Sequence, residues 1–218
     1  MSVPVLNDLL TVVVLALVAW RLVGAARLSL SGPGRARVRF IVRGIRWRHV
    51  WPIPLVLAAV VAVMVVLFTF VPYADKGWWS LLGGQGNPAF GQTSRTAGTV
   101  FEWLIPTVFV MLLVPALPLF AQREEEIFRV GAEARTRLGR LKKSVLFGLV
   151  HAVVGIPVGA ALALSVGGVY FTHCYLRAVR RHGRRDDGLL ESTRAHTAYN
   201  GVIVALLLVV VVTSAIGS

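Results

Sequence analysis

Long apolar runs alternate with short basic segments along the whole chain. A helix needs roughly 20 mostly apolar residues to cross a bilayer. Five runs approach or exceed that length, at positions 3–26, 50–73, 100–122, 144–176 and 200–217. Since none of them shows the strict alternation of a half-buried strand, the pattern predicts an all-α, polytopic membrane protein.

The fourth run, residues 144–176, is too long for one helix that crosses the bilayer perpendicularly. Near its middle it contains Gly155-Ile156-Pro157-Val158-Gly159, which is typical of a turn or a kink. We therefore expect a tight pair of helices, with a short first helix before Pro157. The chain would then have about six membrane-spanning helices.

The distribution of basic residues gives the orientation of these helices. Nineteen of the 23 Lys and Arg residues fall in three segments, 24–49, 122–143 and 177–190, whereas residues 74–99 hold only two. The positive-inside rule places the three basic segments in the cytoplasm. They all reach that side only if the run 144–176 crosses twice, and both termini then lie outside.

Composition excludes several other classes of protein. Of the 218 residues, 56% are hydrophobic and only 15% are charged, against about 25% charged in soluble domains. The net charge of +13 is spread between apolar runs, so membrane lipids are the expected partners and nucleic acid is not. The single cysteine, Cys174, excludes an intramolecular disulfide and a multi-thiolate metal site.

The chain divides into two predicted parts. Residues 1–99 would form a transmembrane hairpin with a basic cytoplasmic loop and a Gly-rich outer loop. Asp8 and the lack of Lys or Arg before the first apolar core argue against a cleaved signal peptide. Residues 100–218 carry the candidate chemistry. The Val-, Ala-, Arg- and Gly-rich composition indicates a bacterial protein, and hence the bacterial inner membrane.

Burying an ionisable residue within the membrane costs free energy, so such residues are candidates for function. Three clusters occur, at 124–129, 147–151 and 196–200. Each has a plain structural explanation: a surface ion pair, a hydrogen-bonded histidine and an interhelical hydrogen bond. However, His151 and His196 each lie about 12 Å into their helices from the cytoplasmic side at 1.5 Å per residue. We expect them to converge with Glu124 and Glu125.

The residues of the three clusters are Glu124-Glu125-x-x-Phe128-Arg129, Phe147-Gly148-Leu149-Val150-His151 and His196-Thr197-Ala198-Tyr199-Asn200. They form the motifs EExxxR, FxxxH and HxxxN, in this order. This order resembles that of the CPBP family of intramembrane proteases, which includes the CAAX prenyl proteases and bacteriocin-processing homologues. The chain departs from the family at Val130, where a glycine is usual, and in having fewer than about eight spans.

The resemblance implies a glutamic endopeptidase without metal or cofactor, active at the cytoplasmic side of a helical bundle. Glu124 would activate a water with help from His151, and His196 and Asn200 would stabilise the oxyanion. The substrate would be a membrane-anchored peptide or protein, cut in CAAX-type or leader-peptide processing. The implied catalytic residues are Glu124, His151, His196 and Asn200, and the supporting residues are Glu125, Arg129 and Phe147.

Three other functions fit the same residues. A zinc hydrolase could use Glu124, His151 and His196 as ligands, although the H-E-x-x-H spacing is absent. A non-catalytic immunity or scaffold protein needs no reacting group. A transporter could use the intramembrane Glu and His as a proton relay, but the sequence has no two similar halves.

Overall fold

The computed structural model describes residues 3–84, 86–87, 92–93 and 96–216. The regular secondary structure of the described chain is helical except for one pair of two-residue antiparallel strands, so the α-helical prediction is confirmed. Parts of the predicted Gly-rich outer loop, and the last residue of the last predicted apolar run, lie outside the described residues. The elements are α1 (Val3–Leu30), α2 (Gly32–Arg43), α3 (Trp47–Val50), α4 (Ile53–Phe70), α5 (Trp78–Leu81), β1 (Gly86–Asn87), β2 (Gln92–Thr93), α6 (Phe101–Phe128), η2 (Ala132–Ala134), α7 (Arg137–Leu149), η3 (Val150–Val154), α8 (Val158–Ala163), α9 (Ser165–His182) and α10 (Arg185–Ile216).

Four segments of the described chain are long and apolar enough to cross a membrane, as expected for a membrane protein. They are Val5–Leu30, Trp47–Phe70, Phe101–Ala134 and Val158–His182. Helix α7 has a polar, basic first half, and α10 is polar before residue 200. Both helices therefore mix a polar half with an apolar half, so the prediction of six spans stays a prediction.

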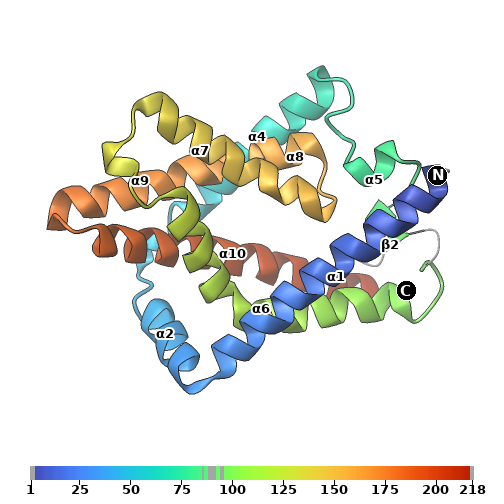
Figure 1. The fold of residues 1–218 in the computed structure, drawn as a ribbon, viewed down its shortest axis with the longest axis horizontal. Helices are drawn as coiled ribbons and strands as arrows, with labels where there is room; N and C mark the ends of the chain where they lie inside the picture. The colour runs from blue at the N-terminus through green and yellow to red at the C-terminus, as the bar shows by residue number, and fades with distance from the viewer. Residues whose placement is uncertain (1–2, 85, 88–91, 94–95, 217–218) are drawn as a thin grey trace.

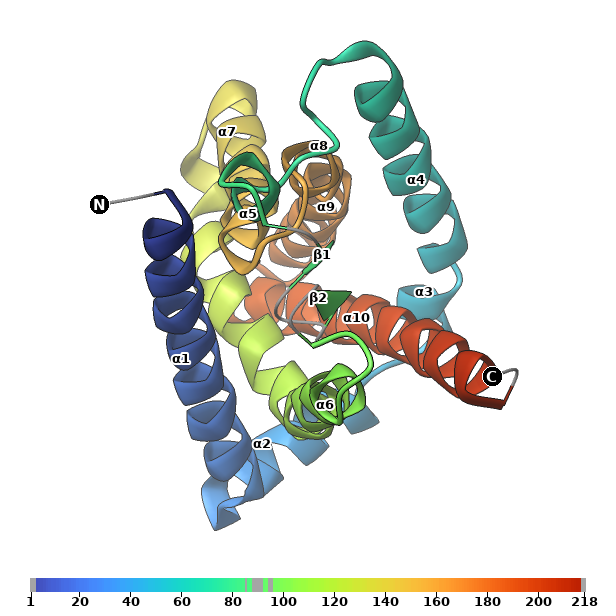
Figure 2. The ribbon, with the colours of Figure 1, turned by 90° about the vertical axis from the view of Figure 1, so that its right-hand side faces the viewer.

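Helices α6, α7, α9 and α10 form the centre of the molecule. Helix α10 packs against α9 and α6, and α7 packs against α9. Helix α1 covers α6, and α4 packs on α8 and α9 (Figures 1 and 2). In Figure 1 the two described ends of the chain lie at one end of the molecule, whereas α2 and the α9–α10 turn lie towards the other.

The apolar run 144–176 reverses direction where the sequence indicated. Helix α7 ends at Leu149 and η3 follows, and Gly155 then takes a left-handed conformation with φ of 85°. Only glycine adopts this conformation at little cost, and Pro157 immediately precedes α8. The expected pair of helices is therefore present as α7 against α8 and α9.

Close packing of α7 on α9 depends on Gly168. A Cβ atom at this position would lie 3.0 Å from the backbone oxygen of Ser144 and 3.1 Å from the Phe147 ring. The close approach also brings Ser144 Oγ to 3.4 Å from Thr172 Oγ1. The small residues of this run thus serve contacts within the chain, which fix where Phe147 lies.

A polar contact joins α3 to α10, with His49 buried beside it. The Arg48 guanidinium donates two hydrogen bonds of 2.9 Å to the Glu191 carboxylate. His49 Nε2 lies 3.1 Å from Glu191 Oε1. His49 is 1% exposed, although a histidine at the end of a basic segment is more often solvated. The reason is long-range: Glu191 supplies an ionic partner that no local pattern reveals.

This contact makes stability depend on pH. Although burial acts to raise the pKa of Glu191, the hydrogen bonds from His49 and Arg48 outweigh it and lower that pKa to about 2. Because the folded pKa lies below the unfolded one, Glu191 stabilises the fold above about pH 4.5 and loses that contribution as the pH falls towards 2. We expect Glu191→Gln to lower the Tm at pH 6, and the difference from wild type to vanish near pH 2. An equal Tm difference at both pH values would contradict this.

The predicted orientation can be tested by labelling. In a Cys174→Ser background, Ser80→Cys places a thiol on exposed α5, and Arg137→Cys places one at the start of α7. A membrane-impermeant maleimide should label the first in intact cells and the second only after lysis, because the basic segments are expected inside. The reverse labelling would show that the orientation is wrong.

Candidate active site

The C-terminal end of α6 carries a fully buried ion pair. Glu125 and Arg129 lie four residues apart, so they share one face of the helix. Both side chains are 0% exposed, and Arg129 Nε lies 3.4 Å from Glu125 Oε2. The backbone N–H of Arg129 donates to the Glu125 carbonyl at 2.8 Å. Glu125 and Arg129 therefore do not form the surface ion pair that was one explanation of this motif; the pair lies inside the protein.

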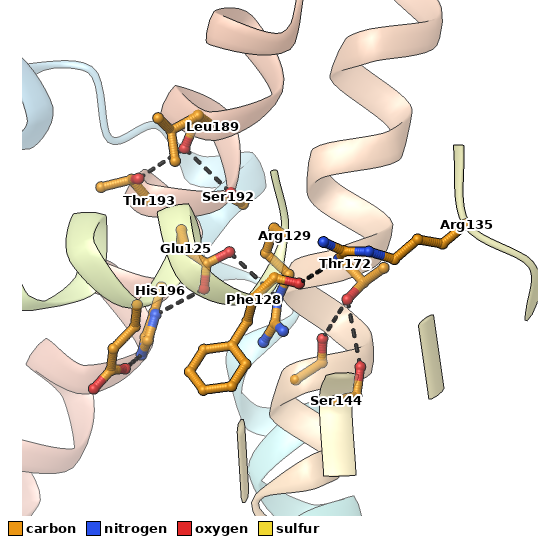
Figure 3. Close-up of polar contacts among 12 residues, drawn as sticks. Glu125, Phe128, Arg129, Arg135, Ser144, Thr172, Leu189, Ser192, Thr193 and His196 are labelled. Carbon is orange, nitrogen blue, oxygen red and sulfur yellow. Dashed lines mark hydrogen bonds and ion pairs between the residues drawn. The ribbon is translucent and has the colours of Figure 1, made fainter. Parts of the chain in front are cut away.

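His196 of α10 connects the two neighbouring carboxylates. Its Nδ1 lies 3.0 Å from Glu125 Oε1, and its Nε2 lies 3.5 Å from Glu124 Oε2. An ionised carboxylate only accepts hydrogen bonds, so Nδ1 donates to Glu125. His196 is 1% exposed, whereas the Glu124 side chain is 27% exposed. Figure 3 shows Glu125 between His196 and Arg129.

Aromatic rings enclose the imidazole of His196. Phe171 of α9 stacks on it with ring centres 4.3 Å apart and planes at 19°. Phe147 of α7 meets it edge-on at 5.4 Å. Sequence analysis missed Phe171, because it lies in none of the three motifs. The one signal was its spacing of four residues from Tyr175, which is also buried and shares its helix face.

The Arg129 guanidinium is held by charge and by ring faces. Its nitrogen atoms form no hydrogen bond with a described residue. Instead its Cζ lies 4.7 Å from the centre of the Phe147 ring and 5.8 Å from that of Phe128. A desolvated cation–π contact is worth about 2 kcal/mol, so the rings and Glu125 together offset part of the cost of burying this charge.

His151 approaches the same group of residues from α7. It lies in the short 3₁₀ helix η3, beyond the end of α7, and not within a continuous helix as expected. Its Nδ1 lies 2.8 Å from the carbonyl oxygen of Phe147, which can only accept, so Nδ1 carries the hydrogen. In the neutral ring Nε2 then keeps its lone pair. The His151 ring also contacts the Phe147 ring at 5.2 Å.

Six of the seven residues predicted for the site lie together. Glu124, Glu125, Arg129 and His196 form one polar cluster, and Phe147 links it to His151. Asn200 lies one helical turn after His196 and is half-buried, but it makes no hydrogen bond with a described residue. Their catalytic roles stay predictions.

The cluster holds carboxylates and imidazoles, which can accept a proton from water or donate a hydrogen bond to an anion. Among the described residues, no three His, Cys, Asp or Glu side chains are arranged to hold a metal ion. The geometry therefore gives no particular support to Glu124, His151 and His196 as a zinc ligand set.

Scans against protein-family models, curated proteins and solved structures found no match. The resemblance to intramembrane proteases therefore depends on the three ordered motifs.

The buried pair should be far more important for stability than a surface pair on the same helix. We expect Arg129→Met to lower the free energy of unfolding by about 3–5 kcal/mol, because it leaves the Glu125 charge buried without its partner. The control is Arg123→Met, which breaks the exposed Arg123–Glu126 pair and should cost less than about 1 kcal/mol. Denaturant unfolding in detergent measures both, and equal losses would contradict the distinction.

Proposed function

We propose that this protein is an intramembrane endopeptidase that cleaves a membrane-anchored peptide or protein with a glutamate-activated water. The observation that carries this proposal is the position of His196, whose two ring nitrogens face the carboxylates of Glu124 and Glu125. The order of the three motifs supports the same conclusion.

Two adjacent glutamates in different surroundings can take different roles. Glu125 is buried and bound by Arg129 and His196, so it has a structural task. Glu124 is partly exposed, and among the described residues its carboxylate pairs with His196 alone, at 3.5 Å. Glu124 is therefore the carboxylate that can reach a water and a substrate.

The reaction would proceed by general base catalysis. Glu124 takes a proton from water, and the water oxygen adds to the carbonyl carbon of the peptide. The tetrahedral intermediate then loses the amine as the C–N bond breaks, and the proton held by Glu124 passes to the amine nitrogen. No covalent enzyme intermediate is needed.

The neighbouring residues orient these groups. Glu125 accepts from His196 Nδ1, which directs Nε2 towards Glu124. When protonated, that nitrogen carries one N–H, which can donate to Glu124 or, once Glu124 has taken the proton of the water, to the oxyanion formed beside it. The lone pair on His151 Nε2 offers a second acceptor for the water, and Asn200 is the proposed second donor to the oxyanion.

The proposed setting is the cytoplasmic side of a bacterial inner membrane, in a chain with six spans. The described ends of the chain lie at one end of the molecule, away from basic segments such as α2 and the α9–α10 turn. This arrangement agrees with the positive-inside rule if the basic segments face the cytoplasm. Substrates held in the membrane would then enter sideways between helices.

Three consecutive glutamates provide matched variants for a test. We expect Glu124→Gln to slow cleavage of a library of membrane-anchored peptides by about 10²–10⁴-fold, because it removes the general base. Glu126→Gln is the control, because Glu126 binds Gln122 and Arg123 outside the cluster. It should keep the rate within about threefold, since surface changes have small effects.

The same assay distinguishes the alternatives. Cleavage that continues unchanged in Glu124→Gln would exclude Glu124 as the base. Loss of wild-type cleavage with a zinc chelator, and its return with added zinc, would favour the zinc hydrolase. If the folded wild type cleaves no library member but retains one partner protein in a pull-down, the scaffold function is favoured.

A further inference from the structure

A second polar site lies outside the Glu124–His196 cluster, between α3, α9 and α10. It is a pocket of about 130 Å³ at the end of the molecule where α9 turns into α10 (Figure 1). Four arginines contribute to its wall, and the carboxylates of Asp187 and Glu191 are the acidic groups there. The arginines are Arg48, Arg177, Arg181 and Arg194.

The positive charge of this arginine pocket is only partly compensated. Four arginines face two carboxylates, which leaves a net charge of +2 with His182 neutral. Glu191 is already bound by Arg48 and His49. Arg177 and Arg181 are exposed and form no hydrogen bond or ion pair with any described residue. The wall therefore presents two guanidinium groups that have no partner in the described part of the chain.

Arg194 strengthens the attraction for an anion. Burial, together with the positive charges of Arg48, Arg46 and Arg37, lowers the pKa of Arg194 against the opposing effect of Glu191. An anion placed in the pocket would relieve this repulsion between arginines. Guanidinium groups bind phosphate oxygens through paired N–H donors, which makes phosphate the natural ligand class.

A hollow of about 340 Å³ adjoins the arginine pocket along α9 and is lined by His173, Leu176, Arg177, Arg180 and Arg181. Arg177 and Arg181 line both sites. The surface of the hollow is mostly apolar although Leu176 is the one aliphatic residue in its lining, because arginine presents a hydrocarbon stem below its charged head. A charged pocket beside such a surface suits an amphipathic molecule better than a free ion. The polar pocket itself is too small for a drug-sized ligand, which needs about 300–1,000 Å³.

The position of the arginine pocket relative to the membrane also favours an amphipathic ligand. Trp47 and Trp51 flank Arg48 and are 75% and 52% exposed. Exposed tryptophans at the end of a spanning helix mark the level of the lipid headgroups. Basic pockets between helices on the cytoplasmic side are typical binding sites for anionic headgroups.

We propose that the arginine pocket binds the phosphate of an anionic phospholipid, with Arg177 and Arg181 on its oxygen atoms and one acyl chain in the hollow beside Leu176. This inference does not depend on the proposed hydrolysis. The phosphate in the pocket could belong to a lipid headgroup or to a free phosphate ion. The experiment therefore has to distinguish these two ligands.

The test measures lipid bound to the purified full chain. The protein is exchanged into phosphatidylcholine nanodiscs with or without phosphatidylglycerol, and the lipid retained after transfer to detergent is counted by native mass spectrometry. We expect about one phosphatidylglycerol per chain in the wild type. Arg177→Gln/Arg181→Gln should weaken retention about tenfold or more, because each arginine donates charge-assisted hydrogen bonds to the phosphate.

The control variant removes the same charge elsewhere. Arg35→Gln/Arg137→Gln changes two exposed arginines on α2 and α7 that do not line the pocket, and it should retain lipid within about twofold of wild type. An equal loss of retained lipid in both variants would show that retention depends only on general surface charge, and it would overturn the proposal. Thermal unfolding of both variants in detergent checks that they are folded.

Competition identifies the source of the phosphate. Millimolar inorganic phosphate should not displace the bound phosphatidylglycerol, because a free ion lacks the acyl chain that occupies the hollow. Full displacement by inorganic phosphate would show that the ligand is a free ion and would overturn the lipid assignment. Displacement by a soluble acidic peptide at micromolar concentration would assign the pocket to a peptide and would likewise overturn it.

Discussion

Burial of the Glu125–Arg129 pair is the constraint on which the centre of the structure depends. Two charges taken out of water cost several kcal/mol each, and their mutual attraction offsets this only when further partners are present. Here the partners come from three other helices: His196 from α10, Phe147 from α7 and, behind the imidazole, Phe171 from α9. The end of α6 is therefore stable only where those helices meet.

Similar polar contacts hold the basic end of the molecule together. Glu133 of η2 accepts from the Tyr175 hydroxyl at 3.0 Å and from Arg185, so one carboxylate joins η2 to α9 and α10. Arg48 and Glu191 do the same for α3 and α10. Within lipid, apolar surfaces gain little by meeting one another. Polar contacts of this kind therefore decide which helices become neighbours.

The proposed function depends on the same buried charges. Glu125, which stabilises the fold, and Glu124, which would activate water, are adjacent in the chain, yet Glu125 is buried and Glu124 is partly exposed. A single imidazole faces both, so the orientation of Glu124 depends on the buried pair behind it. Helix α10 also forms one wall of the arginine pocket, where Glu191 lies five residues before His196. Helix α10 thus carries both the proposed chemistry and the proposed lipid contact.

Local rules in the sequence determined the helical class, the reversal at Gly155–Pro157 and the shared face of Glu125 and Arg129. Each of these depends on residues a few positions apart, through hydrophobic run length, left-handed backbone or helical periodicity. Motif order also suggested that His196 would lie near Glu124 and Glu125.

Tertiary structure decided the rest. The exit of His151 into a 3₁₀ helix, the stacking of Phe171 on His196 and the burial of His49 against Glu191 follow from how helices rotate and tilt against one another. So does the half-buried setting of Asn200, which makes no hydrogen bond with a described residue. Contacts between helices distant in the chain depend on that rotation, which leaves no periodic signal in a single sequence.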